Sequence, residues 1–84
     1  MRVKVKYFAV LHEELDRDEE EMDLPDGATV KVILDRLEAE WPEIAEYYDV
    51  MQTSVNWEYA TPDSELTDGD EVAFIPPVTG GQDV

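Results

Sequence analysis

The stretch from Val30 to Trp41 is the longest amphipathic helix pattern in the chain, and it limits the possible folds more than any other feature. Apolar residues recur at helical spacing on one side and charged residues fill the other. The apolar positions are Val30, Ile33, Leu34, Leu37 and Trp41. Thr29 can cap the helix, and Pro42 ends or restarts it because the residue before a proline is driven out of the helical region. A single helix of this kind must bury its apolar side against a sheet.

Strand patterns lie on both sides of this helix. Residues 2–8 alternate, with Val3, Val5 and Tyr7 on one face and Arg2, Lys4 and Lys6 on the other. We expect the basic face to be charge-protected and paired with acidic neighbours, or else to anchor an acidic partner. Further strands are predicted at Glu20–Leu24 with Met22 and Leu24 inward, within Val50–Ala60 with Val55, Trp57 and Tyr59 on one face, and at Glu71–Ile75; a short helix is predicted at Ala9–Leu15.

This order of elements predicts an α+β fold. A mixed sheet packed on one main helix, with a right-handed crossover between parallel strands, is the β-grasp (ubiquitin-like) architecture. We assign residues 1–77 to this domain and residues 78–84 to a flexible C-terminal tail.

Composition excludes several function classes. The 84 residues include 22 Asp and Glu against 6 Lys and Arg, a formal charge of −16, so binding to nucleic acid is not expected. The acidity indicates either a solvated surface suited to high salt or steering towards a basic partner. There is no cysteine, no signal peptide pattern and no segment of about 20 apolar residues, so we expect a cytoplasmic protein without a membrane span.

No pattern of metal-binding or catalytic residues is evident. His12 stands alone, without a second ligand or nucleophile nearby in sequence. The acidic run Asp16–Asp23 lacks the alternating ligands and the turn glycine of a calcium-binding EF-hand loop, so it is interpreted as solvated.

The C-terminal stretch has an unusual composition. The Asp68-Gly69 turn leads into the apolar strand Glu71–Ile75, and Pro76-Pro77 ends it because proline has no backbone N–H to donate. Val78 and Thr79 then precede Gly80-Gly81. Glycine has no Cβ, so this dipeptide can enter a channel too narrow for other residues. An extended segment from Val78 to Gly81 would reach roughly 13 Å.

The chain resembles the small subunits of molybdopterin synthase, the MoaD-type sulfur carriers. The resemblance covers nearly the whole chain, and its most specific part is an Asp-Gly-Asp-Glu-Val turn followed by Pro-Pro-Val-x-Gly-Gly. The matching segments are Val5–Ala9, Leu24–Val30, Val55-Asn56, Leu66–Phe74 and Pro76–Gly81.

The resemblance implies a non-catalytic carrier subunit. An ATP-dependent, E1-like activating enzyme would adenylate the carboxylate of Gly81, and sulfur transfer would convert the acyl-adenylate to a thiocarboxylate. The molybdopterin synthase large subunit would then accept the tail. The carrier itself would bind no cofactor and no metal, and ATP would be used by the activating enzyme.

This sequence departs from the family pattern at its C-terminus, because Gln82-Asp83-Val84 follow Gly81 and leave its carboxyl group in a peptide bond. Removal by a processing protease, an artefact of cloning or annotation, and loss of carrier function are the three explanations. Other functions also stay open: a ubiquitin-like modifier joined through Gly81 to target lysines, a sulfur carrier for thiamine or cysteine synthesis, and a structural or interaction domain.

The resemblance and the apolar pattern together define the candidate site. Gly81 is the reactive position. The expected partner contacts are Phe8, the exposed side of Phe74 and Ile75, and the exit and tail residues Pro76, Pro77, Val78, Thr79 and Gly80.

Overall fold

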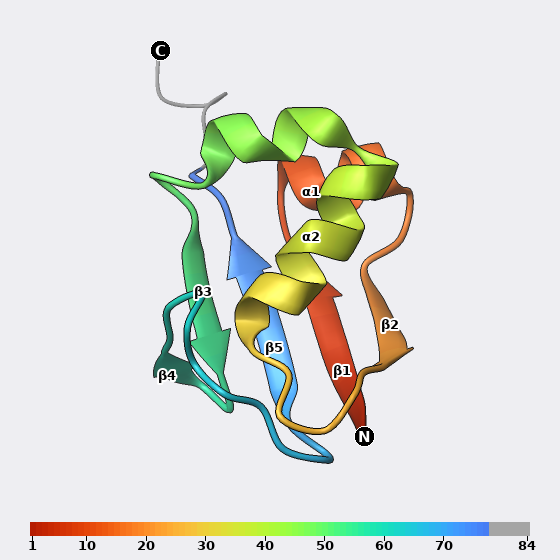
Figure 1. Ribbon diagram of the computed structural model, residues 1–84. Helices are drawn as coiled ribbons and strands as arrows, with labels where there is room; N and C mark the ends of the chain where they lie inside the picture. The colour runs from red at the N-terminus through yellow and green to blue at the C-terminus, as the bar shows by residue number, and fades with distance from the viewer. Residues whose placement is uncertain (78–84) are drawn as a thin grey trace, which may run out of the picture.

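Residues 1–77, the part of the computed structural model that is described, form a five-stranded mixed sheet with α2 lying across one face (Figure 1). The elements in chain order are β1 (Arg2–Tyr7), α1 (Val10–Leu15), β2 (Glu19–Asp23), α2 (Val30–Glu40), the 3-10 helix η1 (Pro42–Tyr47), β3 (Gln52–Val55), β4 (Glu58–Tyr59) and β5 (Glu71–Ile75). The strand order is β2-β1-β5-β3-β4. β1 and β5 pair in parallel, and the other pairs are antiparallel. This arrangement confirms the predicted α+β sheet on one main helix.

The core lies between α2 and the inner face of the sheet, as the face covered by α2 is called here. Alternation along β1 buries Val3, Val5 and Tyr7, and the period of α2 buries Ile33 and Leu37 against them. The remaining buried apolar residues of this core come from α1, β2, α2, η1, β5 and the connecting loops: Leu11, Leu15, Met22, Leu24, Ala28, Val30, Leu34, Ile44, Leu66, Val72 and Phe74. The inward orientation predicted for Met22 and Leu24 is confirmed.

The start of α2 differs from the prediction in its capping. Thr29 has the extended backbone of a capping residue, but its side chain makes no capping hydrogen bond. Instead, the N–H of Val30 donates to the carbonyl of Ser64 at 3.0 Å, and the N–H of Lys31 donates to the carbonyl of Pro62 at 2.9 Å. The loop before β5 therefore satisfies the unpaired donors of the first helical turn. The carbonyl groups of Pro62 and Ser64, which are distant from the helix in sequence, thus cap it in place of the Thr29 hydroxyl.

The predicted third strand is wrong in its extent, because the chain reverses in its middle. β3 and β4 form a hairpin in which Ser54 pairs with Tyr59 and Val55 pairs with Glu58. Asn56 and Trp57 are the two turn residues, with φ of 52° and 71°. Positive φ at both positions is the type I′ geometry that matches strand twist in two-residue hairpins. Val55 packs against the core, whereas Trp57 and Tyr59 are exposed, so the three do not share one face.

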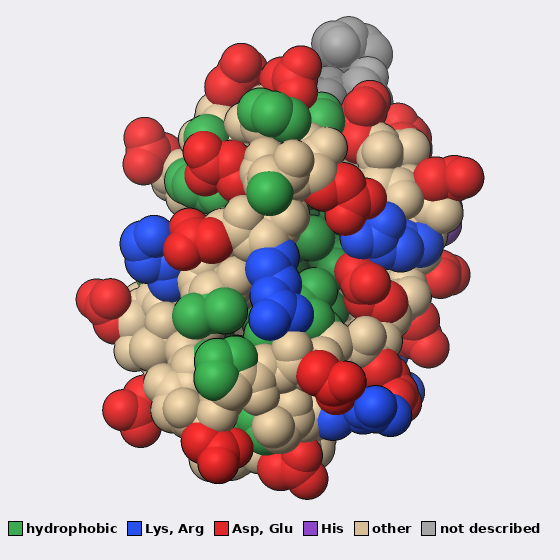
Figure 2. All heavy atoms as spheres, turned by 45° about the vertical axis from the view of Figure 1, so that its right-hand side comes forward, with side chains coloured by type: hydrophobic (Ala, Val, Ile, Leu, Met, Phe, Trp, Pro, Cys, Tyr) green, Lys and Arg blue, Asp and Glu red, His purple; other side chains and the backbone are tan. Residues whose placement is uncertain are grey.

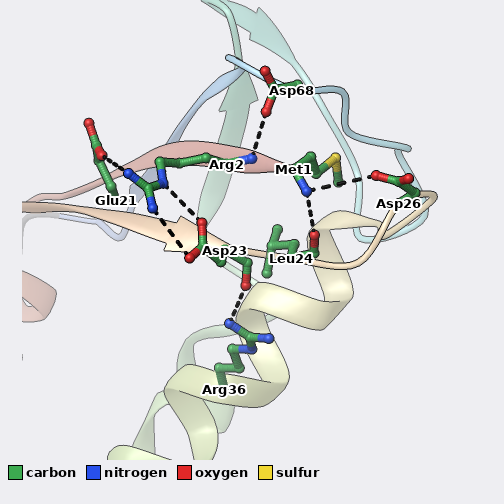
Figure 3. Close-up of polar contacts among 8 residues, drawn as sticks. All are labelled: Met1, Arg2, Glu21, Asp23, Leu24, Asp26, Arg36 and Asp68. Atoms are coloured by element: carbon green, nitrogen blue, oxygen red, sulfur yellow. Dashed lines mark hydrogen bonds and ion pairs between the residues drawn. The ribbon is translucent and has the colours of Figure 1, made fainter.

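Charged side chains near the N-terminus connect β1 to its neighbours (Figure 3). The Arg2 guanidinium donates to Asp23 at 2.9 Å, and the Arg2 backbone N–H donates to the Asp68 carboxylate at 2.8 Å. Arg36 of α2 donates to the carbonyl of Asp23 at 2.8 Å. Lys6 pairs with Glu71 at 3.3 Å. The prediction that basic residues on β1 are paired with acidic neighbours is confirmed for Arg2 and Lys6.

Acidic side chains dominate the surface outside these pairs. In the view of Figure 2 they project all around the molecule, with few Lys and Arg among them. Because like charges repel, this distribution favours solubility and disfavours compaction at low ionic strength. It is consistent with both interpretations of the −16 charge, a surface suited to high salt or steering towards a basic partner.

Candidate functional site

The end of β5 is where the candidate site begins. Phe74 and Pro76 are fully buried, while Ile75 and Pro77 are exposed. The prediction that Phe74 has an exposed side is therefore wrong: its pairing with Tyr7 and Thr53 places it on the inner face, under α2. Pro76 likewise contributes no surface in the free protein. These two residues fix the position from which the chain leaves the sheet.

Ile75 and Phe8 lie together on the outer face of the sheet, the face opposite α2. Ile75 follows buried Phe74, and Phe8 follows buried Tyr7, the residue paired with Phe74. Successive side chains in a strand point to opposite faces, so both apolar side chains point outwards. They are 40% and 43% exposed, respectively. The structure thus brings together two of the predicted contacts beside the exit of the chain.

Phe8 is held in place by a tight turn. Ala9 has φ 56° and ψ −129°, and the N–H of Leu11 donates to the Phe8 carbonyl at 3.1 Å. This backbone conformation is one that glycine adopts easily and that a Cβ disfavours. The turn ends β1 at Tyr7 and starts α1, so the exposed ring of Phe8 has a defined position.

Two aromatic residues of this surface were not predicted as site residues. Tyr59 is 81% exposed, and the register places it in one cross-strand row with Ser54, Ala73 and Lys6 on the outer face. Trp57 is 78% exposed, with the Lys6 ammonium 5.9 Å from its ring centroid. The signal that could have found them is Asn56, which accepts positive φ and so marks a turn. The term outer patch is used below for Phe8, Trp57, Tyr59, Ala73 and Ile75.

The Asp-Gly-Asp-Glu segment acts as a support for the outer patch. The Asp70 carboxylate accepts hydrogen bonds from the Thr67 N–H at 2.8 Å and from the Asn56 amide at 2.9 Å. Partial burial alone would raise the pKa of Asp70, but these hydrogen bonds together hold that pKa below its ordinary value. The Glu71 N–H donates in turn to the Asn56 side chain at 3.0 Å. The motif therefore joins the β3–β4 hairpin to the start of β5.

The described residues were compared with the needs of a metal site and of a membrane span. Within residues 1–77, no three His, Cys, Asp or Glu side chains are arranged to hold a metal ion. Over the same range, none of the helices combines the length and the apolar character that a bilayer crossing requires. What this part of the chain provides is an apolar surface next to the end of β5.

A mixed sheet of this order, crossed by one helix, with its last central strand ending in Pro-Pro, defines the class of small ubiquitin-like β-grasp domains. Comparison with known proteins places the chain within that class. It belongs to the ThiS family, which it matches over residues 5–81.

The chain is similar both to sulfur carrier subunits and to small archaeal modifier proteins. The molybdopterin synthase sulfur carrier subunit of Mycobacterium tuberculosis is 37% identical over 82 residues, which cover 96% of this chain and 99% of that protein. SAMP1 of Haloferax volcanii, a small archaeal modifier protein, has a crystal structure with a TM-score of 0.83 and 30% identity, covering 96% of this chain and 100% of that one.

A third structure shares the fold at lower identity. It is a protein–protein complex of subunits 1 and 2 of the molybdopterin-converting factor from Helicobacter pylori, with a TM-score of 0.61 and 23% identity. It covers 96% of this chain and 100% of that chain.

The remaining predicted site residues cannot be placed. Val78, Thr79, Gly80 and Gly81, together with the 82–84 extension, lie outside the described residues. Their roles stay predictions.

Proposed function

We propose that the chain is a sulfur carrier for molybdopterin synthesis and that Gly81 carries the sulfur as a thiocarboxylate. The observation that carries this proposal is the family match, which extends to Gly81 and ends there. The 37% identity to a molybdopterin synthase sulfur carrier subunit, which extends over nearly the full length of both chains, supports the same pathway. Residues 82–84 lie beyond the matched part, which is consistent with their removal by a protease before the carrier acts.

The chemistry follows from the poor reactivity of a carboxylate. The ionised Gly81 carboxylate attacks the α-phosphate of ATP on the activating enzyme, forming an acyl-adenylate and releasing pyrophosphate. A sulfide-level sulfur donor then attacks the acyl carbon and displaces AMP, which leaves the thiocarboxylate. Glycine keeps the acyl carbon unhindered, and a narrow tail suits a pocket that excludes water from the intermediate. ATP is bound by the activating enzyme in this scheme, and the carrier needs no cofactor of its own.

The outer patch is the proposed contact with the protein that receives the tail. Phe8 and Ile75 lie beside the end of β5, so a partner that takes residues 78–81 would face this patch as well. The large subunit of molybdopterin synthase is the proposed receiver. The subunit complex of the H. pylori relative, which shares the fold, supports this choice.

The experiment compares the full chain with a form ending at Gly81. Each is incubated with the activating enzyme, ATP and a sulfur donor, and intact mass is measured. We expect exchange of one oxygen for sulfur only in the form ending at Gly81. A matched Gly81→Ala form should react far more slowly, because a methyl group must fit at the reacting carbon. Equal reaction of both glycine- and alanine-terminated forms would contradict the narrow-channel argument.

A second function is favoured by one specific observation. The similarity to SAMP1 of H. volcanii extends over nearly the whole chain, so a ubiquitin-like modifier joined through Gly81 to lysines is the alternative. Both functions need the same adenylation. Isopeptide-linked conjugates in cells that disappear in a Gly81 deletion would favour the modifier, whereas free thiocarboxylate without conjugates would favour the carrier.

A further inference from the structure

A cavity of about 310 Å³ opens beside α2, at the β3–β4 edge of the sheet (Figure 1). β4 pairs only with Ser54 and Val55, so no strand flanks the first half of β3 on that side. The cavity lies between α2 on one side and residues 48–53 and 60–62 on the other. No residue of the outer patch lines it, so it is separate from the proposed partner contact.

The two walls of the cavity that face α2 are held by hydrogen bonds. The Tyr48 hydroxyl donates to the Glu38 carboxylate at 2.9 Å, which ties the chain after η1 to α2. The Ala60 N–H donates to the Thr53 carbonyl at 3.0 Å, and the segment that follows Ala60 caps the first turn of α2. The cavity is therefore formed before anything enters it, so a ligand would lose little free energy to ordering of the protein.

The floor of the cavity carries a buried hydroxyl group. Thr53 pairs with Phe74, lies on the inner face and is 8% exposed. Within residues 1–77 no hydrogen bond uses the Thr53 hydroxyl, although no fully enclosed side-chain oxygen or nitrogen in that range lacks a partner. The hydroxyl must therefore reach the cavity. A polar group among apolar side chains costs free energy unless it is hydrogen-bonded, so this oxygen needs a partner from the cavity side.

The rest of the lining is mainly apolar, and its charged groups lie on the exposed side of α2. Leu34 and Met51 contribute apolar side chains. Near the opening, the Lys31 ammonium is held by Asp35 at 3.0 Å, and Glu38 supplies a second carboxylate. The opening thus has one more carboxylate than ammonium, in a chain with a formal charge of −16. This charge favours a cationic ligand over an anionic one.

We propose that this cavity binds a small aromatic ammonium compound. Its ring would lie against Tyr48 and Met51, because aromatic rings and thioethers both contact an aromatic ring favourably. A ring N–H would donate to the Thr53 hydroxyl, and the ammonium group would lie near Glu38. The volume is at the lower end of the range for small-molecule sites, which suits a compound of one or two rings. The inference goes beyond the carrier function and does not rest on it.

The test is an NMR titration of the isotope-labelled full chain with tryptamine. Indole and indole-3-acetate serve as the neutral and anionic compounds with the same ring. We expect saturable shifts of the Leu34, Met51 and Thr53 signals, with a Kd for tryptamine of about 1 mM or tighter. Indole should bind more weakly than tryptamine, and indole-3-acetate should bind most weakly.

Four variants locate the binding. Thr53→Val keeps the shape of the side chain but removes the hydroxyl, so it should bind tryptamine about three- to tenfold more weakly. Ala60→Leu fills the cavity and should abolish binding. Glu38→Gln should narrow the preference for tryptamine over indole. Ser54→Ala is the matched control, because it removes a hydroxyl from the next residue of β3, on the outer face, and should bind like wild type. Thermal unfolding without the probe shows that each variant is folded.

Two results would overturn the inference. Absence of saturable shifts with all three compounds would mean that the cavity holds water only. Equal affinity of tryptamine for wild type, Thr53→Val and Ala60→Leu would mean that the cation is attracted to the acidic surface at large. Should Ala60→Leu fail to fold, Thr53→Val against Ser54→Ala still decides. Each of these results leaves the carrier proposal standing, because sulfur loading of Gly81 is measured separately by intact mass.

Discussion

The two faces of the sheet are built from the same strands but differ in burial. On the inner face, Val5, Val72 and Phe74 are fully buried under α2. On the outer face, Phe8 and Ile75, which follow buried Tyr7 and Phe74 in the sequence, are exposed, and the hairpin adds the exposed residues Trp57 and Tyr59. Because side chains alternate along a strand, one short segment such as β5 supplies core residues and surface residues in turn. The comparison teaches that adjacent residues differ sharply in burial here, so fold stability and the proposed partner contact can be changed separately.

Phe74→Ala should have the largest effect on stability. The phenyl ring is fully buried, so its removal costs transfer free energy and leaves a cavity, a loss of about 3–5 kcal/mol in the free energy of unfolding. That is a large share of the roughly 5–15 kcal/mol typical of a domain. Urea unfolding measures it. A loss below about 1 kcal/mol would contradict the assignment of Phe74 to the core.

Ile75→Ala is the matched change one residue further along the same strand. Because Ile75 is partly exposed on the outer face, we expect a loss of stability below about 1.5 kcal/mol, and at least about tenfold weaker binding to the large subunit. Unfolding and isothermal titration of the same preparations would show the two effects. Unchanged binding would remove Ile75 from the docking surface.

Ala9→Gly should increase stability. Ala9 has φ 56° and ψ −129°, a conformation costing of order 1 kcal/mol for alanine that glycine adopts freely. Glycine also gives the unfolded chain more entropy, so we expect a net gain of up to about 1 kcal/mol. Thermal unfolding measures it. A clear loss of stability would show that the turn after Phe8 does not have this backbone conformation.

Asp70→Asn should make stability less dependent on pH in the acid range. Hydrogen bonds outweigh burial and lower the pKa of Asp70 in the folded state below the ordinary 3.8, so the unfolded state binds the proton more readily. Its contribution is present above that ordinary value and is lost as pH falls through the folded pKa. After solvent screening it amounts to less than about 1 kcal/mol. Urea midpoints from pH 2 to 6 should fall less on acidification in the variant than in wild type. Parallel curves for the two proteins would contradict the prediction.

Periodicity was sufficient to predict the parts of the fold that depend on local pattern. The helix from Val30 and the strands β1 and β5 follow from spacing alone, and so does the burial of Met22 and Leu24. Both faces of β5 are apolar, however, and alternation cannot tell which one meets the helix. That is why Phe74 was assigned an exposed side, although Ile75 has it.

The missed features depend on contacts between distant residues or on unusual turn chemistry. The first turn of α2 is satisfied by the Ser64 carbonyl, which no local capping rule can identify. The β3–β4 hairpin carries Trp57 where glycine is the usual signal, so the segment has the pattern of one continuous strand.

The most direct test of the central claim, that Gly81 is the sulfur-carrying terminus, is the intact mass of the protein purified from its own cells. The account predicts a species ending at Gly81, with a fraction heavier by the exchange of one oxygen for sulfur. A single species ending at Val84, unchanged in cells that are making molybdopterin, would contradict the account.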